Sequence, residues 1–315
     1  MTFQLPRLPV FVLSFLGVSL ASQSDSKASV PRPDHAPFDA ILAATVRDER
    51  IDYVAVRDDY GAALLAYRQT MANVDAKRLP EPEALAYWFN VYNASMIAAV
   101  VDRLRGDWTP ATDDFAVFKA KTVLVSGGVT TLDAVEHDIL RKEFEEPRLH
   151  VALVCGARSC PPLLPRAYRG EDLDPTLAAN LTRFVRDPAR NRVDVEGKTL
   201  VLSRIFDWFK DDFGGETGVR ALVGRQVGVD AGRFALSYLD YDWHLNWAPP
   251  RDGWLVAAVG KVPLASAPAT DDVLVEVEAG TVLHAVGESD GMLTVVVPGK
   301  GADRGYLPVA RARRL

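Results

Sequence analysis

Both cysteines of this 315-residue chain lie in one short segment, and they have the most reactive side chains in the sequence. Cys155 and Cys160 permit several interpretations. A disulfide would close a loop of six residues and add only about 2 kcal/mol of stability. A thiolate nucleophile would use His150 or His137 as its base, with Arg158 lowering the thiol pKa. A buried, inert thiol would have no chemical role, and the sequence leaves all of these open.

Metal binding is the weakest interpretation of the same residues. The spacing C-x4-C, with histidines isolated elsewhere in the chain, lacks the ligand pattern of the common zinc modules. We therefore expect no metal site, and no motif in the sequence indicates an organic cofactor.

Two carboxylates and a histidine lie on a helix predicted over residues 131–144. Asp133 and His137 are four residues apart and can touch, whereas Glu136 lies about 100° round the helix from His137. A carboxylate that orients a histidine is part of general-base chemistry, but the same spacing is common in exposed ion pairs. Glu136 and His137 are therefore candidate catalytic residues, with an exposed pair as the alternative.

Two asparagines interrupt an apolar helix predicted over residues 84–104. Asn90 and Asn93 are three residues apart, share a face of that helix and need hydrogen-bond partners when buried. They could hold a neighbouring loop, or one amide could point into a site as an oxyanion or carbonyl ligand.

Several blocks between about residues 80 and 247 resemble the family known as domain of unknown function 547. They are WFNVYN from Trp88, Glu136-His137 with Arg141, PRLHVALVCGARSCPP from Pro147, LSRIFDW from Leu202, Asp212-Phe213 and YDWHLN from Tyr241. The family has no assigned function, so the resemblance implies a shared polar constellation and no particular reaction. The residues of this chain that would belong to the constellation are Asn90, Asn93, Glu136, His137, Arg141, His150, Cys155, Arg158, Ser159 and Cys160.

The elements that must position these residues indicate an α+β fold, with a helix-rich domain around a small sheet over residues 38–248. Apolar periodicity and turn residues predict helices near Phe38 and at residues 60–71, 84–104, 131–144, 175–186 and 217–227, with hairpins at 121–130 and 193–202. The apolar run at 149–154 predicts a strand buried on both faces, and residues 235–239 predict another. We expect Trp208 and Phe213 in the core.

Residues 253–315 have a different character, because short valine-rich strands alternate with glycine turns. This pattern predicts a small all-β barrel. The blocks VEVEAGTV from Val275, GMLTV from Gly291 and GYLP from Gly305 resemble a bacterial SH3-like domain. The resemblance implies a cell-envelope polymer or peptide as partner, and a purely structural appendage is the alternative.

The N-terminal residues indicate the compartment of the protein, and its net charge limits which partners are expected. Residues 1–21 read as a cleaved signal peptide and residues 22–37 as a linker, so we expect a periplasmic or secreted protein whose mature N-terminus lies near Ser22. No membrane segment is expected after cleavage. A formal net charge of −6 without a long Lys/Arg run argues against nucleic acid as a partner.

These residues support two hypotheses for function. The first is an exported envelope enzyme that hydrolyses or transfers acyl groups at an amide or ester. It would use Cys155, Cys160, His150, His137 and Glu136 for catalysis, and Asn90, Asn93, Arg141, Arg158 and Ser159 for binding. The second is a noncatalytic envelope-binding or scaffold protein in which Cys155 and Cys160 form a structural disulfide.

Overall fold

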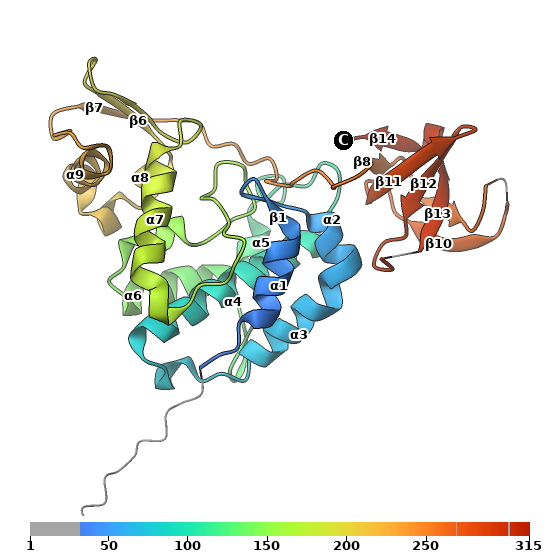
Figure 1. The fold of residues 1–315 in the computed structure, drawn as a ribbon, viewed down its shortest axis with the longest axis horizontal. Helices are drawn as coiled ribbons and strands as arrows, with labels where there is room; N and C mark the ends of the chain where they lie inside the picture. The colour runs from blue at the N-terminus through green and yellow to red at the C-terminus, as the bar shows by residue number, and fades with distance from the viewer. Residues whose placement is uncertain (1–31, 269, 302) are drawn as a thin grey trace, which may run out of the picture. The chain divides into compact units, whose positions relative to one another are not determined.

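The computed structural model describes residues 32–268, 270–301 and 303–315. The predicted signal peptide and the first ten residues of the predicted linker, 22–31, lie outside the described residues. A helix-rich part with small sheets is followed by an all-strand part, which confirms the α+β class (Figure 1).

One long helix forms the centre of the helix-rich part. Helix α4 (Glu81–Asp102) has Pro82 in its first turn, where the missing N–H costs nothing, and acidic Glu81 and Glu83 complement the positive end of the helix dipole. Its middle is buried on all sides, as its apolar composition predicts. Among the described residues, α4 is the one helix long and apolar enough to cross a membrane, and 89% of its apolar window is buried inside the fold.

The other helices surround α4 or follow it in the chain. The α-helices are α1 (Ala36–Thr45), α2 (Tyr53–Ala55), α3 (Gly61–Met71), α5 (Ala116–Lys119), α6 (Arg141–Glu143), α7 (Leu173–Arg186), α8 (Ile205–Trp208) and α9 (Gly215–Val227). Two segments are π-helical, η1 (Val56–Tyr60) and η3 (Ala134–Leu140). The 3₁₀ helices are η2 (Ala76–Arg78), η4 (Pro147–Val151), η5 (Gly170–Asp172), η6 (Lys210–Phe213) and η7 (Val309–Arg311).

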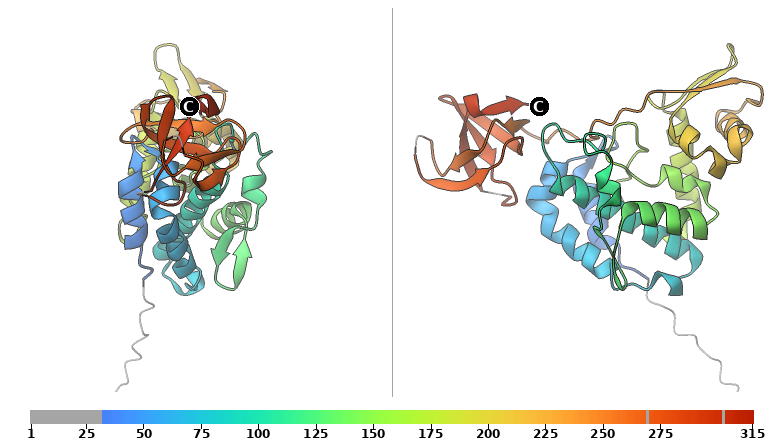
Figure 2. Two further views of the ribbon diagram at one scale, coloured as in Figure 1. Left: turned by 90° about the vertical axis from the view of Figure 1, so that its right-hand side faces the viewer. Right: turned by 180° about the vertical axis from the view of Figure 1, so that it is seen from behind.

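Three small sheets accompany these helices. They are the hairpin β1 (Val46–Arg47) with β2 (Arg50–Ile51), the hairpin β3 (Val123–Val125) with β4 (Gly128–Thr130), and a sheet of β5 (Arg192–Asp194), β6 (Thr199–Leu202) and β7 (Ala235–Tyr238). Strands β6 and β7 run parallel, and this sheet stands at the margin of the helices in each view (Figure 2). Both predicted hairpins are confirmed.

The C-terminal part is one antiparallel sheet of seven strands, which confirms the all-β prediction. Its strands are β8 (Trp254–Ala258), β9 (Val262–Ala265), β10 (Val273–Val277), β11 (Val282–Ser289), β12 (Met292–Val296), β13 (Arg304–Pro308) and β14 (Ala312–Arg314). Their order is β10-β9-β13-β12-β11-β8-β14. Its own apolar core includes Leu264, Leu283, Val295 and Leu307.

The strand predicted at residues 149–154 is wrong, because Pro147–Val151 forms the 3₁₀ helix η4. Pro147 starts the helix, and the Glu146 side chain accepts a hydrogen bond from the Arg148 backbone N–H. The chain then passes α4, where the Asn93 amide donates to one backbone carbonyl and accepts from one backbone N–H. An apolar run is compatible with either a buried strand or a buried helix. Here the side chain of Asn93 makes the backbone hydrogen bonds that a neighbouring strand would otherwise make.

Candidate functional site

A cavity of about 360 Å³ opens beside the disulfide loop and is the candidate site. It brings together residues from α4, η3, η4, α8 and the segments around residues 115–119, 153–161 and 241–243. Titratable side chains lie within a wall that is rich in aromatic side chains. The lining residues are Tyr92, Phe115, Phe118, Lys119, Asp133, Glu136, His137, His150, Leu153, Val154, Cys155, Cys160, Pro161, Ile205, Trp208, Phe209, Tyr241 and Trp243.

The π-helix η3 presents Glu136 to this cavity. Sequence periodicity predicts an ordinary helix here, and the wider π turn instead lets the Arg141 backbone N–H bond the Glu136 carbonyl five residues earlier. The Glu136 carboxylate accepts a hydrogen bond from the Tyr92 phenol at 3.2 Å, and its side chain is only 15% exposed. Burial raises the pKa of Glu136 to about 7, although the Tyr92 hydrogen bond and the Arg141 charge favour the ionised form.

His150 lies next to Glu136 and is almost wholly buried. Its Nε2 is 2.7 Å from Asp212 Oδ2, its Nδ1 is 3.8 Å from Glu136 Oε1, and its ring stacks on Phe209 with centroids 3.9 Å apart. Burial lowers the pKa of His150 to about 4, so the ring is neutral at pH 7. An ionised carboxylate only accepts hydrogen bonds, so Nε2 carries the proton and the Nδ1 lone pair faces Glu136.

Asp212 is kept ionised by a bidentate ion pair with Arg141. Arg141 donates from Nε and Nη2 to the two carboxylate oxygens at 2.6 and 2.8 Å. These hydrogen bonds lower the pKa of Asp212 to about 2. Arg141 Nη1 also lies 3.2 Å from Nδ1 of His137, which therefore accepts from the guanidinium. Arg141 thus connects the two candidate histidines through one charged network.

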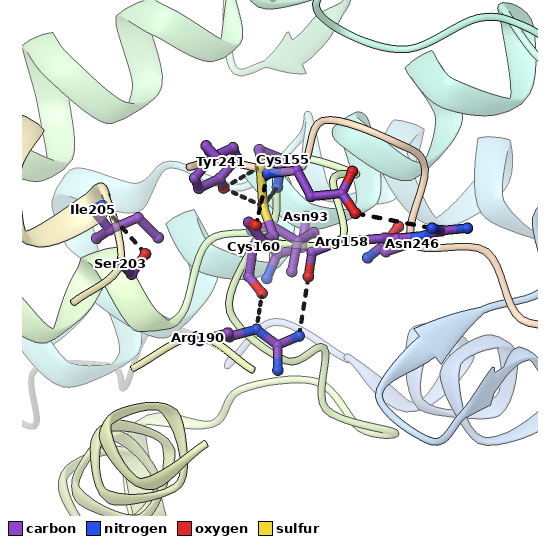
Figure 3. Close-up of a disulfide and its surroundings, with 12 residues drawn as sticks. Asn93, Cys155, Arg158, Cys160, Arg190, Ser203, Ile205, Tyr241 and Asn246 are labelled. Carbon is purple, nitrogen blue, oxygen red and sulfur yellow. Dashed lines mark hydrogen bonds and ion pairs between the residues drawn. A yellow bond between two sulfur atoms is a disulfide. The ribbon is translucent and has the colours of Figure 1, made fainter. Parts of the chain in front are cut away.

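Cys155 and Cys160 are joined by a disulfide (Figure 3). Both residues line the cavity. Of the interpretations that the sequence left open, the structure therefore agrees with the disulfide. Neither sulfur is available as a thiolate while the S–S bond remains. Arg158 and Ser159, in the same loop, face elsewhere. Arg158 is 48% exposed and lies 3.9 Å from Asp242, whose backbone N–H donates to the Ser159 hydroxyl at 2.9 Å.

The amides of Asn90 and Asn93 are both used to hold the chain. Asn93 donates to the Ala152 carbonyl at 2.9 Å and accepts from the Val154 N–H at 3.0 Å. Asn90 makes the same two-sided pair with the backbone of Tyr168, at 2.9 Å in each direction. These bonds match the interpretation that the asparagines secure neighbouring segments.

An aromatic cluster that the sequence did not reveal forms one side of the cavity. Trp208, Tyr241 and Trp243 contact one another with ring centroids 4.5 to 6.0 Å apart. The prediction of a core position holds for Phe213, which is 7% exposed, and is wrong for Trp208, which is 48% exposed. A half-exposed tryptophan beside a cavity can stack on a ligand.

Sequence reasoning also missed Tyr92, Asp212 and Tyr241 as site residues. All three lie inside the blocks that carry the family resemblance, so the blocks themselves held the available signal. No group of three or more His, Cys, Asp or Glu side chains within the described ranges is arranged to hold a metal ion.

Part of the chain matches a known protein family. Residues 76–185 match the model of a family described as a protein of unknown function, DUF547. No curated protein and no solved structure matches the chain. The family match includes Glu136, His150 and both cysteines but ends before Asp212 and the expected blocks up to residue 247. Over residues 76–185, the chain is therefore similar to the DUF547 family.

Proposed function

We propose that this protein is an enzyme whose cavity performs general acid–base catalysis, with Glu136 as the residue that exchanges a proton with the substrate. The observation that carries the proposal is the placement of Glu136, a carboxyl buried between Tyr92 and His150 at the wall of an aromatic cavity. A general acid–base is most effective when its pKa lies near the working pH, and burial brings the pKa of Glu136 to about 7.

The neighbouring residues support this role. Asp212 accepts a hydrogen bond from the Nε2–H of His150, so the lone pair of Nδ1 is directed toward Glu136. Burial raises the pKa of Glu136 to about 7 and lowers that of His150 to about 4, so Glu136 is the one of the two that holds a proton near neutral pH. Arg141 holds Asp212 in its charged form. His150 and Asp212 are thus positioning residues, and Glu136 is the catalytic one.

Hydrolysis or acyl transfer at an amide or ester fits this arrangement. Glu136, when ionised, would take a proton from a water or alcohol as it attacks the carbonyl carbon. It would then return that proton to the leaving nitrogen or oxygen as the tetrahedral intermediate collapses. This scheme replaces the thiolate of the sequence hypothesis, because the Cys155–Cys160 disulfide leaves no free thiolate.

Turnover of chromogenic substrates tests the proposal. The full-length protein would be assayed with 4-nitrophenyl acyl esters and aminoacyl 4-nitroanilides as wild type, Glu136→Gln and Glu143→Gln. We expect Glu136→Gln to lower kcat by about 100-fold or more, as for loss of a general acid–base. Glu143 is exposed and lies outside the cavity lining, so its variant should match wild type. Equal turnover in Glu136→Gln would contradict the assignment.

A noncatalytic binding protein is the second candidate, and the disulfide is the observation that favours it. A bonded Cys155–Cys160 pair and a wall of packed aromatic rings suit a preformed binding site. Saturable binding of a cell-envelope peptide or polymer without turnover, unaffected by Glu136→Gln, would support this candidate.

The proposal also includes export and an SH3-like identity for the C-terminal sheet. Export is supported by the apolar stretch of residues 8–20 before a small-residue cleavage site. The SH3-like identity is supported by the sequence blocks of residues 275–308 and by the seven-stranded antiparallel sheet that contains them.

A further inference from the structure

The two cysteines of the disulfide differ in exposure. Both line the cavity, but Cys160 is 2% exposed whereas Cys155 is partly exposed. Of the two cysteines, Cys155 is therefore the one more open to a small molecule that enters the cavity.

Two hydrogen-bond donors face the buried sulfur. The Cys155 backbone N–H lies 2.8 Å from Cys160 Sγ, and the Tyr241 phenol lies 3.5 Å from it and 3.2 Å from Cys155 Sγ (Figure 3). A disulfide sulfur is a weak acceptor, whereas a thiolate accepts hydrogen bonds strongly. Burial raises the pKa of Tyr241, so its phenol keeps the proton and remains a donor. The Cys155 N–H therefore stabilises Cys160 more once it is a thiolate, and the Tyr241 phenol, which is within reach of both sulfurs, can donate to the sulfur that carries the charge.

The loop that carries the sulfurs is held in place without the S–S bond. The backbone N–H groups of Arg158 and Ser159 donate to carbonyls of residues 242–244 at 2.8 and 3.2 Å. Arg190 donates from Nε to the Cys160 carbonyl at 2.8 Å (Figure 3). Breaking the S–S bond should leave these contacts intact, so the disulfide is available for chemistry and is not needed to brace the loop.

We propose that Cys155 and Cys160 form a thiol–disulfide exchange centre for a low-molecular-weight thiol that enters the cavity. The thiolate of that molecule attacks Cys155 Sγ, the S–S bond breaks, and its electron pair goes to Cys160 Sγ, which becomes a thiolate. A second thiolate then attacks the external sulfur of the mixed disulfide and releases Cys155 as a thiolate. Each protein thiolate takes up one of the two protons that the external thiols lose. Two thiols are thereby oxidised to one disulfide while the protein disulfide is reduced to two thiols, and the same steps run in reverse.

This activity goes beyond the proposed acid–base function, and its readout needs no amide or ester. The full-length oxidised protein would be incubated with 2-mercaptoethanol, quenched with acid at intervals and mapped by peptide mass spectrometry. We expect a transient mercaptoethanol adduct on Cys155, followed by the dithiol, with an unchanged circular dichroism spectrum.

Variants of the two cysteines fix the direction of attack. Cys160→Ser treated with hydroxyethyl disulfide should be modified fully at Cys155. Cys155→Ser should react at least about tenfold more slowly, because its remaining thiol is buried and less accessible. Equal rates, or a wild-type adduct on Cys160, would overturn the proposal.

Tyr241→Phe tests the leaving-group donor. Loss of one hydrogen bond to a charged sulfur should slow the first step by about tenfold. Tyr238→Phe removes a phenol from strand β7 outside the cavity and should leave the rate unchanged. An unaltered rate in Tyr241→Phe, reduction only in denaturant, or free thiols in the untreated protein would each refute the exchange centre. Should Tyr241→Phe fail to fold, the cysteine variants decide the matter.

Discussion

Replacing Glu136 by Gln tests the electrostatics of the cavity. Burial raises the pKa of this carboxyl from 4.5 to about 7, so the folded protein holds a proton that the unfolded chain has already released. The resulting stabilisation is fully present below pH 4.5 and is lost as the pH rises through about 7. Because a tenfold change in proton affinity corresponds to about 1.4 kcal/mol, the loss between about pH 5 and about pH 8 is roughly 2–3 kcal/mol.

Gln has nearly the same shape as Glu but does not titrate, so its contribution to stability stays constant with pH. Urea unfolding of wild type and Glu136→Gln at intervals from about pH 5 to about pH 8 measures the difference. The free energy of unfolding of the variant should rise by roughly 2–3 kcal/mol relative to that of wild type over this range.

Glu143→Gln is the matched control for this series. Its carboxylate is exposed and lies seven residues further along the chain, so the difference from wild type should not vary by more than a few tenths of a kcal/mol. A difference for Glu136→Gln that is equally flat would refute the claim that burial in the cavity controls the protonation of Glu136.

Three further substitutions probe the surroundings of the cavity. Asp212→Asn removes a carboxylate whose pKa Arg141 holds at about 2, so its stabilising contribution is present above pH 3.8 and is lost as the pH falls. The free energy of unfolding of wild type, relative to this variant, should therefore shrink by roughly 2 kcal/mol between about pH 6 and about pH 2 in urea titrations. Asn93→Leu leaves buried backbone groups of residues 152–154 without partners, so it should lower the free energy of unfolding by about 1–3 kcal/mol in the same assay. Wild-type stability would contradict the claim that Asn93 holds this segment against α4. Trp208→Ala should raise the KM of any substrate of the cavity, because the half-exposed ring lies in the cavity wall; an unchanged KM would exclude Trp208 from binding.

The sequence by itself determined the elements whose signals are local. The helix predicted over residues 84–104 forms at Glu81–Asp102, because Pro82 and the acidic first turn mark its start and an unbroken apolar run continues it. The hairpins at 123–130 and 192–202 also form where turn residues interrupt alternating segments. In each case the residues that decide the structure are close together in the chain.

Tertiary structure decided the elements whose partners are distant. The composition of the apolar run after Pro147 is equally compatible with a buried strand and with a buried helix. Pro147 and the Glu146 cap start a 3₁₀ helix that ends at Val151. Beyond it, Asn93 on another helix supplies the hydrogen bonds to Ala152 and Val154 that a neighbouring strand would otherwise supply.

The same division applies to the site. Residue types and spacing identified Cys155, Cys160 and Glu136 as candidates, but they left open whether the cysteines are bonded and whether the carboxyl is buried. His150 meets Asp212 across 62 positions of sequence, and Cys155 meets Tyr241 across 86. Protonation and hydrogen bonding depend on desolvation and on charges within a few ångströms, and only the folded chain brings those groups together.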